Sequence, residues 1–433
     1  MWRSGWSRRN ARPLRSSRSI TVSRETATVV LAQVLTPQGV SGDLHHEAGH
    51  YEFRYSGSTP DVAVSLTMPV RRDQYRATQL LPIFQQSLPE GFVLEQLRLR
   101  LAKLSHFDPM LLLALTGNDG AIGRLCVQSP EIEHLFGKTK TAAKGERLAE
   151  ILAWDGTENL FTELVERYLL RTGVSGVQPK VLVPERFEPP ASKATLIAGD
   201  LIVKSGQVQY PGLAINEFVC MSIARAANIP VPEFYLSDRH DLFVMRRFDR
   251  RHDDGMPLGF EDMATLMGLG TPQKYEGSYE RLARVIRNNC PAENVRAALT
   301  QLFDMVALSV IVGNGDAHLK NFGLLYTHPA AADCRIAPAY DIVNTTAYLP
   351  DDALALTLGG SKSFQAARLH LLELAGRCDI EQPRERVRQL LEACAQQLQT
   401  HADLLEEAPV VKQALHHCMQ RMEAGFSRPL ASR

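Results

Sequence analysis

Hydrophobic positions alternate with polar ones near the start of the chain, which indicates strands followed by short helices. A β-branched run at 27–34 and alternating aromatic residues at 51–55 predict a hairpin-rich sheet. Apolar residues then recur at helical spacing in 79–87 and 92–104, and the Leu-Pro-Glu-Gly sequence between them predicts a turn. We therefore expect a small N-terminal α+β unit at residues 25–135.

The rest of the chain changes from strands to helices near Asp249. Apolar and β-branched runs predict strands at 181–183, 200–204 and 242–245, with an amphipathic helix at 216–227. Longer helices are expected at Tyr279–Arg287, Ala292–Val312 and Gln382–Leu398. We therefore expect a smaller lobe at 146–248 and a helical C-terminal lobe at 249–426.

Residues 1–24 differ from both patterns, because they contain seven arginines, many serines and no acidic residue. Such a segment has little to bury, and we expect it to be disordered. It is left out of the prediction of the fold.

Composition narrows the class of protein. Hydrophobic residues make up 45% and charged residues 22%, values typical of a soluble globular chain. Lys+Arg and Asp+Glu are equal at 48 each, so no overall field draws the molecule to nucleic acid or to an anionic membrane. Seven cysteines without a CxxC pair indicate free thiols in a reducing compartment, and we expect a cytoplasmic protein. The apolar run Met305–Val312 is too short to span a membrane and is interpreted as part of a core helix.

The sequence His46 to His50 matches the HExxH pattern of zinc proteases. That pattern requires both histidines on one face of a helix. Glycines surround it here and a strand follows directly, so we expect a turn and no catalytic zinc.

A second pattern is typical of enzymes that transfer phosphoryl groups. Asp316 and Asn321 have the Asp-x-x-x-x-Asn spacing of a kinase catalytic loop and follow an apolar helix that ends near Val312. The carboxylate of Asp316 is expected to face the substrate hydroxyl, while Asn321 offers an oxygen to a hard cation. Asp341, after a strand-like segment, is a candidate second magnesium ligand.

Upstream residues supply the nucleotide-binding parts in the expected order. Lys204 ends an apolar strand, as does the kinase lysine that reaches the α- and β-phosphates. Glu217 either pairs with Lys204 or only complements the dipole of its own helix, and the sequence leaves both interpretations open. The glycine-containing segment Gly173–Lys180 precedes a strand, where a phosphate-covering loop belongs.

These residues together resemble the HipA family of toxin-antitoxin kinases, over about Val29 to Phe426. The similar segments of the two lobes are Ser175–Lys180, Asn216–Glu217, Arg247–Arg250, Gly313–Asn321 and Tyr340–Asp341. The N-terminal unit is similar as well, at Ser65–Pro69, Leu88–Gly91, Asp108 and Gly117–Gly123.

The resemblance implies a protein-kinase-like, two-lobed α+β fold with a mostly helical C-terminal lobe and an additional N-terminal α+β domain. It implies that Asp316 is the catalytic base, that Asn321 and Asp341 bind Mg²⁺, and that residues 146–248 form the ATP-binding lobe. The other ATP contacts that it implies are Ser175, Gly176, Val177, Gln178, Lys180, Lys204, His318, Lys320 and Tyr340, with Arg246, Arg247 and Phe248 as the adenine hinge.

The family also implies partners. Its members phosphorylate proteins on serine, typically an aminoacyl-tRNA synthetase, and are held by a small helix-turn-helix, HipB-like antitoxin that binds DNA. We therefore expect this chain to contact DNA only through such a partner. Two alternatives remain open: a small-molecule kinase on a related fold, and a non-catalytic co-repressor that only assists the antitoxin.

One departure from the family concerns self-inhibition. Family members that inactivate themselves often carry a phosphorylated serine where this chain has Gly173, so Ser175 is the nearby candidate for autophosphorylation. The alternative is that Ser175 is a small turn residue that fits the backbone beside Gly176.

Overall fold

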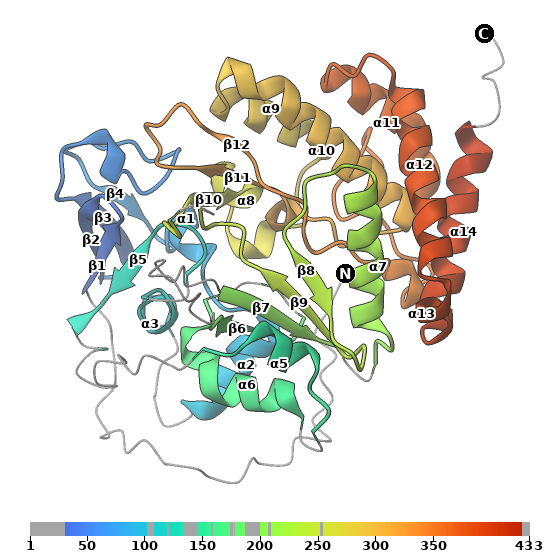
Figure 1. Cartoon of the computed structure of the whole chain (residues 1–433). Coiled ribbons are helices and arrows are strands. Elements are labelled where there is room, and N and C mark those ends of the chain that lie inside the picture. Colours follow the sequence, from blue (N-terminus) through green and yellow to red (C-terminus); the bar gives the residue numbers. More distant parts are fainter. Residues whose placement is uncertain are drawn as a thin grey trace.

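The computed structural model (Figure 1) describes residues 31–101, 108–118, 121–130, 132, 145–156, 159–173, 176, 178–186, 200–206, 209–251 and 254–426. The prediction of disorder for residues 1–24 lies outside the described residues, as do the predicted ATP contacts of Ser175 and Val177.

The N-terminal unit is built on a five-stranded antiparallel sheet in the order β4-β3-β2-β1-β5. Its strands are β1 (Leu31–Thr36), β2 (Gly39–Glu47), β3 (His50–Tyr55), β4 (Tyr75–Ala77) and β5 (Cys126–Gln128). Tyr51, Phe53 and Tyr55 alternate with polar residues along β3 and are buried on one face, which confirms the predicted hairpin.

The helices of this unit are α1 (Pro82–Gln85), α2 (Gly91–Arg100) and α3 (Pro109–Thr116). Helix α3 contacts β5 and α1, whereas α2 contacts the strand Lys180–Pro184 of the smaller lobe. The helix predicted at 79–87 is shorter than expected, because Pro82, which lacks a backbone N–H, occupies its first turn and a turn at Gln86–Ser87 ends it. The helix predicted at 92–104 ends at Arg100, where Leu101 leaves the helical conformation.

A second sheet, in the order β6-β7-β9-β8, forms the centre of the smaller lobe. Its strands are β6 (Lys180–Pro184), β7 (Asp200–Ser205), β8 (Phe234–Leu236) and β9 (Leu242–Arg246). Val203 faces a core shared with Phe53 of the N-terminal sheet, whereas Ile202 faces the core of the C-terminal helices. Because the sheet is buried on both faces, its strands are continuous apolar runs, as in the sequence.

Helices cover both faces of this sheet. Figure 1 shows α2, α5 (Leu148–Leu152) and α6 (Leu160–Tyr168) on one side and α7 (Leu213–Ala226) on the other. The N-terminal unit and the smaller lobe therefore share one hydrophobic core.

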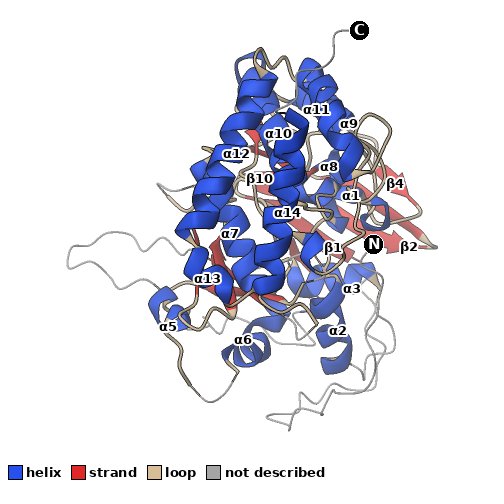
Figure 2. Cartoon of the chain, turned by 90° about the vertical axis from the view of Figure 1, so that its right-hand side faces the viewer, coloured by secondary structure: helices blue, strands red, loops and turns tan. Residues whose placement is uncertain are grey.

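The C-terminal lobe is a helical bundle with a three-stranded sheet in the order β10-β11-β12 (Figure 2). Its helices are α8 (Met263–Leu266), α9 (Tyr279–Asn289), α10 (Ala292–Val312), α11 (Phe364–Arg377), α12 (Pro383–Thr400), α13 (Ala402–Glu406) and α14 (Pro409–Phe426). Its strands are β10 (Gly259–Asp262), β11 (Gly323–Tyr326) and β12 (Arg335–Ile336). Short 3-10 helices lie at Pro60–Val62, Leu169–Arg171, Thr271–Gln273, Leu319–Asn321 and Thr345–Ala347.

Helix α10 is the central helix of this lobe and packs against α9, α11, α12 and α14. By length and composition it is the one helix among the described residues that is apolar enough to cross a membrane, but 72% of its most apolar window is buried within the fold. We interpret α10 as a core helix, and its extent confirms the prediction for Ala292–Val312.

The N-terminal unit is joined to β10 by buried hydrogen bonds. Ser65 Oγ and the Leu66 N–H donate to the carboxylate of Glu261 at 2.6 and 2.7 Å, and Gln86 Nε2 donates to the Phe260 carbonyl at 2.8 Å. The predicted α+β class is confirmed.

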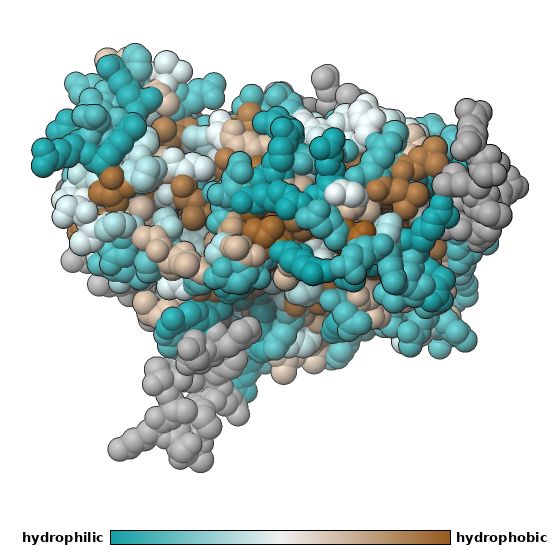
Figure 3. Space-filling model, turned by 90° about the horizontal axis from the view of Figure 1, so that it is seen from above, coloured by the Kyte–Doolittle hydropathy of each residue, from teal (hydrophilic) through white to brown (hydrophobic). Residues whose placement is uncertain are grey.

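Seen from above, the surface carries small, separate hydrophobic patches among hydrophilic side chains (Figure 3).

Candidate active site

The loop that carries Asp316 begins where α10 ends. Gly313 ends the helix in the left-handed region (φ +70°), and a Cβ there would lie 2.7 Å from Cys418 Sγ, so the position requires glycine. The Asp316 carbonyl accepts from the His318 N–H at 2.7 Å and from Asn321 Nδ2 at 3.2 Å. These bonds fold the loop back on itself and bring Asp316 and Asn321 to one side.

Asp316 is held by an aromatic hydroxyl. Tyr275 Oη donates to Asp316 Oδ1 at 2.8 Å. Burial raises the pKa of Asp316 to about 6, although the bond from Tyr275 acts in the opposite direction. A carboxyl group with a pKa near 6 is ionised at neutral pH and is still basic enough to accept a proton.

Lys204, at the end of β7, joins the two lobes. Its Nζ lies 2.5 Å from Glu217 Oε1 and 2.7 Å from Asp341 Oδ1. Of the two interpretations of Glu217, the structure contains the pair with Lys204. Burial alone would lower the pKa of Lys204, but the charges of Asp341 and Glu217 outweigh it and raise the pKa above its usual value.

Asp341 adopts an uncommon backbone conformation, with φ at +58°. Non-glycine residues in this region are often found at functional sites, and aspartate tolerates it better than most. Burial would raise the pKa of Asp341, but the charges of Lys204 and Lys180 hold it well below its usual value. The carboxylate is therefore ionised, and 26% of its surface stays exposed.

The donor set fits a magnesium ion. Asn321 Nδ2 is used within the loop, which leaves its amide oxygen as an acceptor, and Asp341 adds an anionic oxygen nearby. One or two protein oxygens, completed by phosphates and water, are the usual Mg²⁺ environment in kinases.

These residues line one pocket between the lobes. Phe248 and Tyr340 form an aromatic wall, with ring centroids 5.1 Å apart. The predicted site residues that line the pocket are Gly176, Gln178, Lys180, Lys204, Phe248, Asp316, His318, Lys320, Asn321, Tyr340 and Asp341.

Buried polar atoms around the pocket lack partners among the described residues. They are Gln178 Nε2, His318 Nδ1 and Glu217 Oε2. Burial lowers the pKa of His318 to about 3, so its ring is neutral and can accept or donate one hydrogen bond. Because unpaired buried polar atoms are costly, their clustering here indicates a polar ligand.

The structure does not bring the side chains of Arg246 and Arg247 to the pocket. Arg246 Nη2 contacts Glu185 Oε1 at 2.7 Å, and Arg247 is buried against Asp249. Their backbone N–H groups already donate to the carbonyls of Glu233 and Asp200. Their place in an adenine hinge therefore rests on their carbonyl groups and stays a prediction.

The sequence patterns missed two charged residues that line the pocket, Lys274 and Asp262, and also Tyr275, which donates to Asp316. Lys274 and Tyr275 lie in the irregular segment before α9, and Asp262 ends a short strand. None belongs to a spaced motif, so only the fold reveals that they lie beside Asp316.

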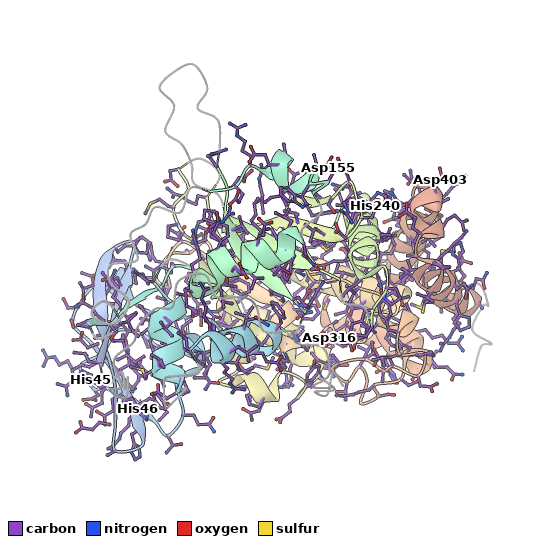
Figure 4. The ribbon with its side chains drawn as sticks, turned by 90° about the horizontal axis from the view of Figure 1, so that it is seen from below. His45, His46, Asp155, His240, Asp316 and Asp403 are labelled. Atoms are coloured by element: carbon purple, nitrogen blue, oxygen red, sulfur yellow. The ribbon has the colours of Figure 1, made fainter. Side chains whose placement is uncertain are left out.

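His46 and His50 lie near the ends of β2 and β3, on either side of the Ala48-Gly49 turn. His46 is paired with Tyr51, so His50, the next residue along β3, points to the opposite face of the hairpin. The helical arrangement that HExxH zinc binding needs is absent. Figure 4 labels His46 at the edge of the molecule and Asp316 near its middle.

Two family models match the chain. The HipA-like C-terminal domain matches residues 172–402, and the HipA N-terminal domain matches residues 32–128. The protein Y4mE of Sinorhizobium fredii is 30% identical over 71% of this chain and 74% of its own length.

Other relatives match over shorter segments. Y4dM of the same organism is 30% identical over 42% of this chain, and the chain spans 47% of its length. The serine/threonine-protein kinase toxin HipA of Shewanella oneidensis is 26% identical over 48% of this chain and 51% of its own length.

A solved structure matches the whole fold. It is the complex of Shewanella oneidensis HipA with HipB and operator DNA, in which a chain 20% identical superposes with a TM-score of 0.61 over 91% of this chain and 97% of that one. The likeness establishes the two-lobed, kinase-like α+β fold with an additional N-terminal domain. With matches to both domain models in order, this chain belongs to the HipA family.

Proposed function

We propose that this protein is an ATP- and Mg²⁺-dependent serine/threonine protein kinase that acts as the toxin of a toxin-antitoxin pair. One observation carries the proposal. Asp316, Lys204 and Asp341, which come from three distant segments, line one pocket whose polar atoms at Gln178 and His318 lack partners among the described residues.

The proposed reaction is an in-line phosphoryl transfer. The hydroxyl oxygen of an acceptor serine or threonine forms a bond to the γ-phosphorus of ATP, while the bond from that phosphorus to the β,γ-bridging oxygen breaks. The electron pair of the broken bond leaves with ADP, and the hydroxyl proton passes to the Asp316 carboxylate. The raised pKa of Asp316 suits it to take that proton.

The other residues orient the nucleotide. Lys204 is fixed by Glu217, so its ammonium group is directed into the pocket, where it is expected to contact the α- and β-phosphates. Phe248 and Tyr340 provide an apolar wall for the base. Asn321 and Asp341 would hold the magnesium ion, which neutralises charge on the phosphates when it is bound.

The partners are proposed from the relatives. The Shewanella oneidensis structure contains HipA together with HipB and operator DNA. We infer a HipB-like helix-turn-helix antitoxin for this chain, an aminoacyl-tRNA synthetase as the class of protein substrate, and the cytoplasm as the compartment.

Phosphoproteomics after induced expression tests this proposal, with the native chain compared with Asp316→Asn. We expect growth arrest and new phosphoserine or phosphothreonine sites only with the native chain. Growth arrest without new protein sites would favour a small-molecule kinase. If both chains repress the operon equally and neither is toxic or causes phosphorylation, the result would support the co-repressor alternative.

A further inference from the structure

Four charged side chains meet where the N-terminal unit borders the pocket. Lys274 Nζ lies 2.9 Å from Glu90 Oε2, while Lys320 Nζ lies 3.7 Å from Glu90 Oε1 and 3.3 Å from Asp262 Oδ2. Both lysines and Asp262 line the pocket with Asp316. Glu90 belongs to the N-terminal unit, 184 residues before Lys274 in the chain.

These charges are nearly removed from water. The side chains of Lys274, Lys320 and Glu90 are only 9%, 8% and 16% exposed. Burying an ammonium group is costly unless an anion compensates it. Glu90 and Asp262 supply that compensation here, and because both lysines also line the pocket, their ammonium groups can in addition face an anionic ligand there.

Lys274 lies at the catalytic end of the pocket. Its positive charge acts on both Asp316 and His318. Its carbonyl accepts from the Leu319 N–H at 3.0 Å, and the next residue, Tyr275, donates to Asp316. The segment of Lys274 thus holds the catalytic loop on two sides, close to where the γ-phosphoryl group would be transferred.

Glu90 is well placed to hold Lys274. It is the N-cap of the ten-residue helix α2, where the helix dipole favours a negative charge, and Gly91 at φ +48° turns the chain there. The carboxylate is thereby fixed on a regular element of the N-terminal unit and is directed at the two lysines.

We infer that Lys274 binds the γ-phosphoryl group of ATP and that Glu90, from the N-terminal unit, is the positioning residue that orients it. This inference rests on the proposed kinase function. It makes the N-terminal unit part of the phosphoryl-transfer site, because the orientation of Lys274 depends on a residue outside both kinase lobes.

Calorimetric titration of the full-length protein with two nucleotides tests this inference. Magnesium complexes of ADP and of the non-hydrolysable β,γ-imido analogue of ATP differ by the γ-phosphoryl group. Lys274→Met should weaken binding of the analogue about 100-fold and leave ADP binding nearly unchanged, since a lost charge contact is worth up to about 3 kcal/mol. Glu90→Gln should weaken analogue binding about tenfold, and Glu90→Asp should restore part of that loss.

Lys412 of α14 and Glu406 of α13 form an ion pair at the surface, and neither residue lines the pocket, so this pair provides matched controls. Lys412→Met and Glu406→Gln should bind both nucleotides as the native chain does. Melting temperatures check folding, and Lys274→Arg keeps the charge if Lys274→Met is unstable.

Several results would overturn the inference. Equal losses of ADP and analogue binding in Lys274→Met would place the lysine elsewhere, and tighter analogue binding by Glu90→Gln would make Glu90 only a competing counter-ion. If the native chain binds both nucleotides and Lys274→Met binds them equally well, the inference is rejected but the proposed function is not. Absence of nucleotide binding by the native chain would instead reject the proposed function.

Discussion

Two buried charge networks in this protein differ in how completely they are paired. In the first, every nitrogen of the Arg247 guanidinium donates, to Asp249, to Asp200 or to the Ala121 carbonyl. In the second, around Lys204, the buried atoms Glu217 Oε2 and His318 Nδ1 have no partner among the described residues. Both networks are buried, but they serve different purposes. The paired network around Arg247 stabilises the fold, whereas the unpaired polar atoms near Lys204 lie beside a cavity and are available to bind a ligand.

The largest effect that tests this comparison is on stability. Arg247→Met leaves Asp249 buried without its main partner, and breaking a buried pair typically costs about 3–5 kcal/mol. We expect a clear fall in the denaturation midpoint. A variant as stable as the native chain that nevertheless loses ATP binding would instead make the Arg247 side chain a nucleotide ligand.

A second prediction concerns the segment that the sequence predicts to cover the phosphates of ATP. Phosphorylation of Ser175 would add about −1.5 to −2 charges at pH 7, which repel the phosphates of ATP. Ser175→Asp should therefore weaken nucleotide binding at least about tenfold, whereas Ser175→Ala should keep both fold and binding. Mass spectrometry of active protein incubated with ATP should find phosphate on Ser175. Phosphate found only elsewhere, together with normal binding by Ser175→Asp, would show that the serine is only a turn residue.

A third prediction follows from the pKa of Asp316, which burial raises from 3.8 to about 6. The stability that this group contributes is present below about pH 4 and is lost as the pH rises through about 6. Asp316→Asn should therefore be more stable than the native chain at pH 7, and the stabilities of the two proteins should converge at low pH.

The same pKa predicts how the rate depends on pH. Below pH 6, the phosphoryl-transfer rate of the native chain should increase up to about tenfold for each unit by which the pH rises. A flat rate profile between pH 5 and 7 would contradict Asp316 as the base.

The smallest effect is expected at the hairpin. Double substitution His46→Ala and His50→Ala should change neither activity nor metal content, because the two side chains occupy opposite faces. Both side chains are half-buried and His46 stacks on Tyr51, so the loss of stability is expected at the lower end for an aromatic contact, about 0.5 kcal/mol. Stoichiometric zinc in the native protein that disappears in the variant would overturn this prediction.

The sequence predicted those features that depend on local order. Regular periodicity predicted the helix at Ala292–Val312 and a strand at 200–204, which the structure has at Asp200–Ser205. Fixed spacing selected Asp316 and Asn321, and both line the pocket. The sequence also predicted the α+β class, since the pattern changes from strands to helices along the chain.

The sequence did not predict contacts between distant segments. Glu90 was recognised only as part of a turn, because its partner Lys274 lies 184 residues away. Arg246 and Arg247 sit in a motif, yet their side chains form ion pairs with Glu185, which follows β6, and with Asp200 of β7. The packing of the N-terminal unit and both lobes around one pocket determines which polar side chains are paired within the protein and which are left to bind a ligand.

Transfer of labelled phosphate from γ-labelled ATP by the purified native chain, compared with Asp316→Asn, tests the central claim most directly. The exposed Asp403→Asn serves as the control. We expect Mg²⁺-dependent labelling by the native and control proteins. A loss of about 10²–10⁴-fold is expected in Asp316→Asn, as for a general base, with ADP still bound. Near-native labelling by Asp316→Asn would show that the pocket is not the site of phosphoryl transfer.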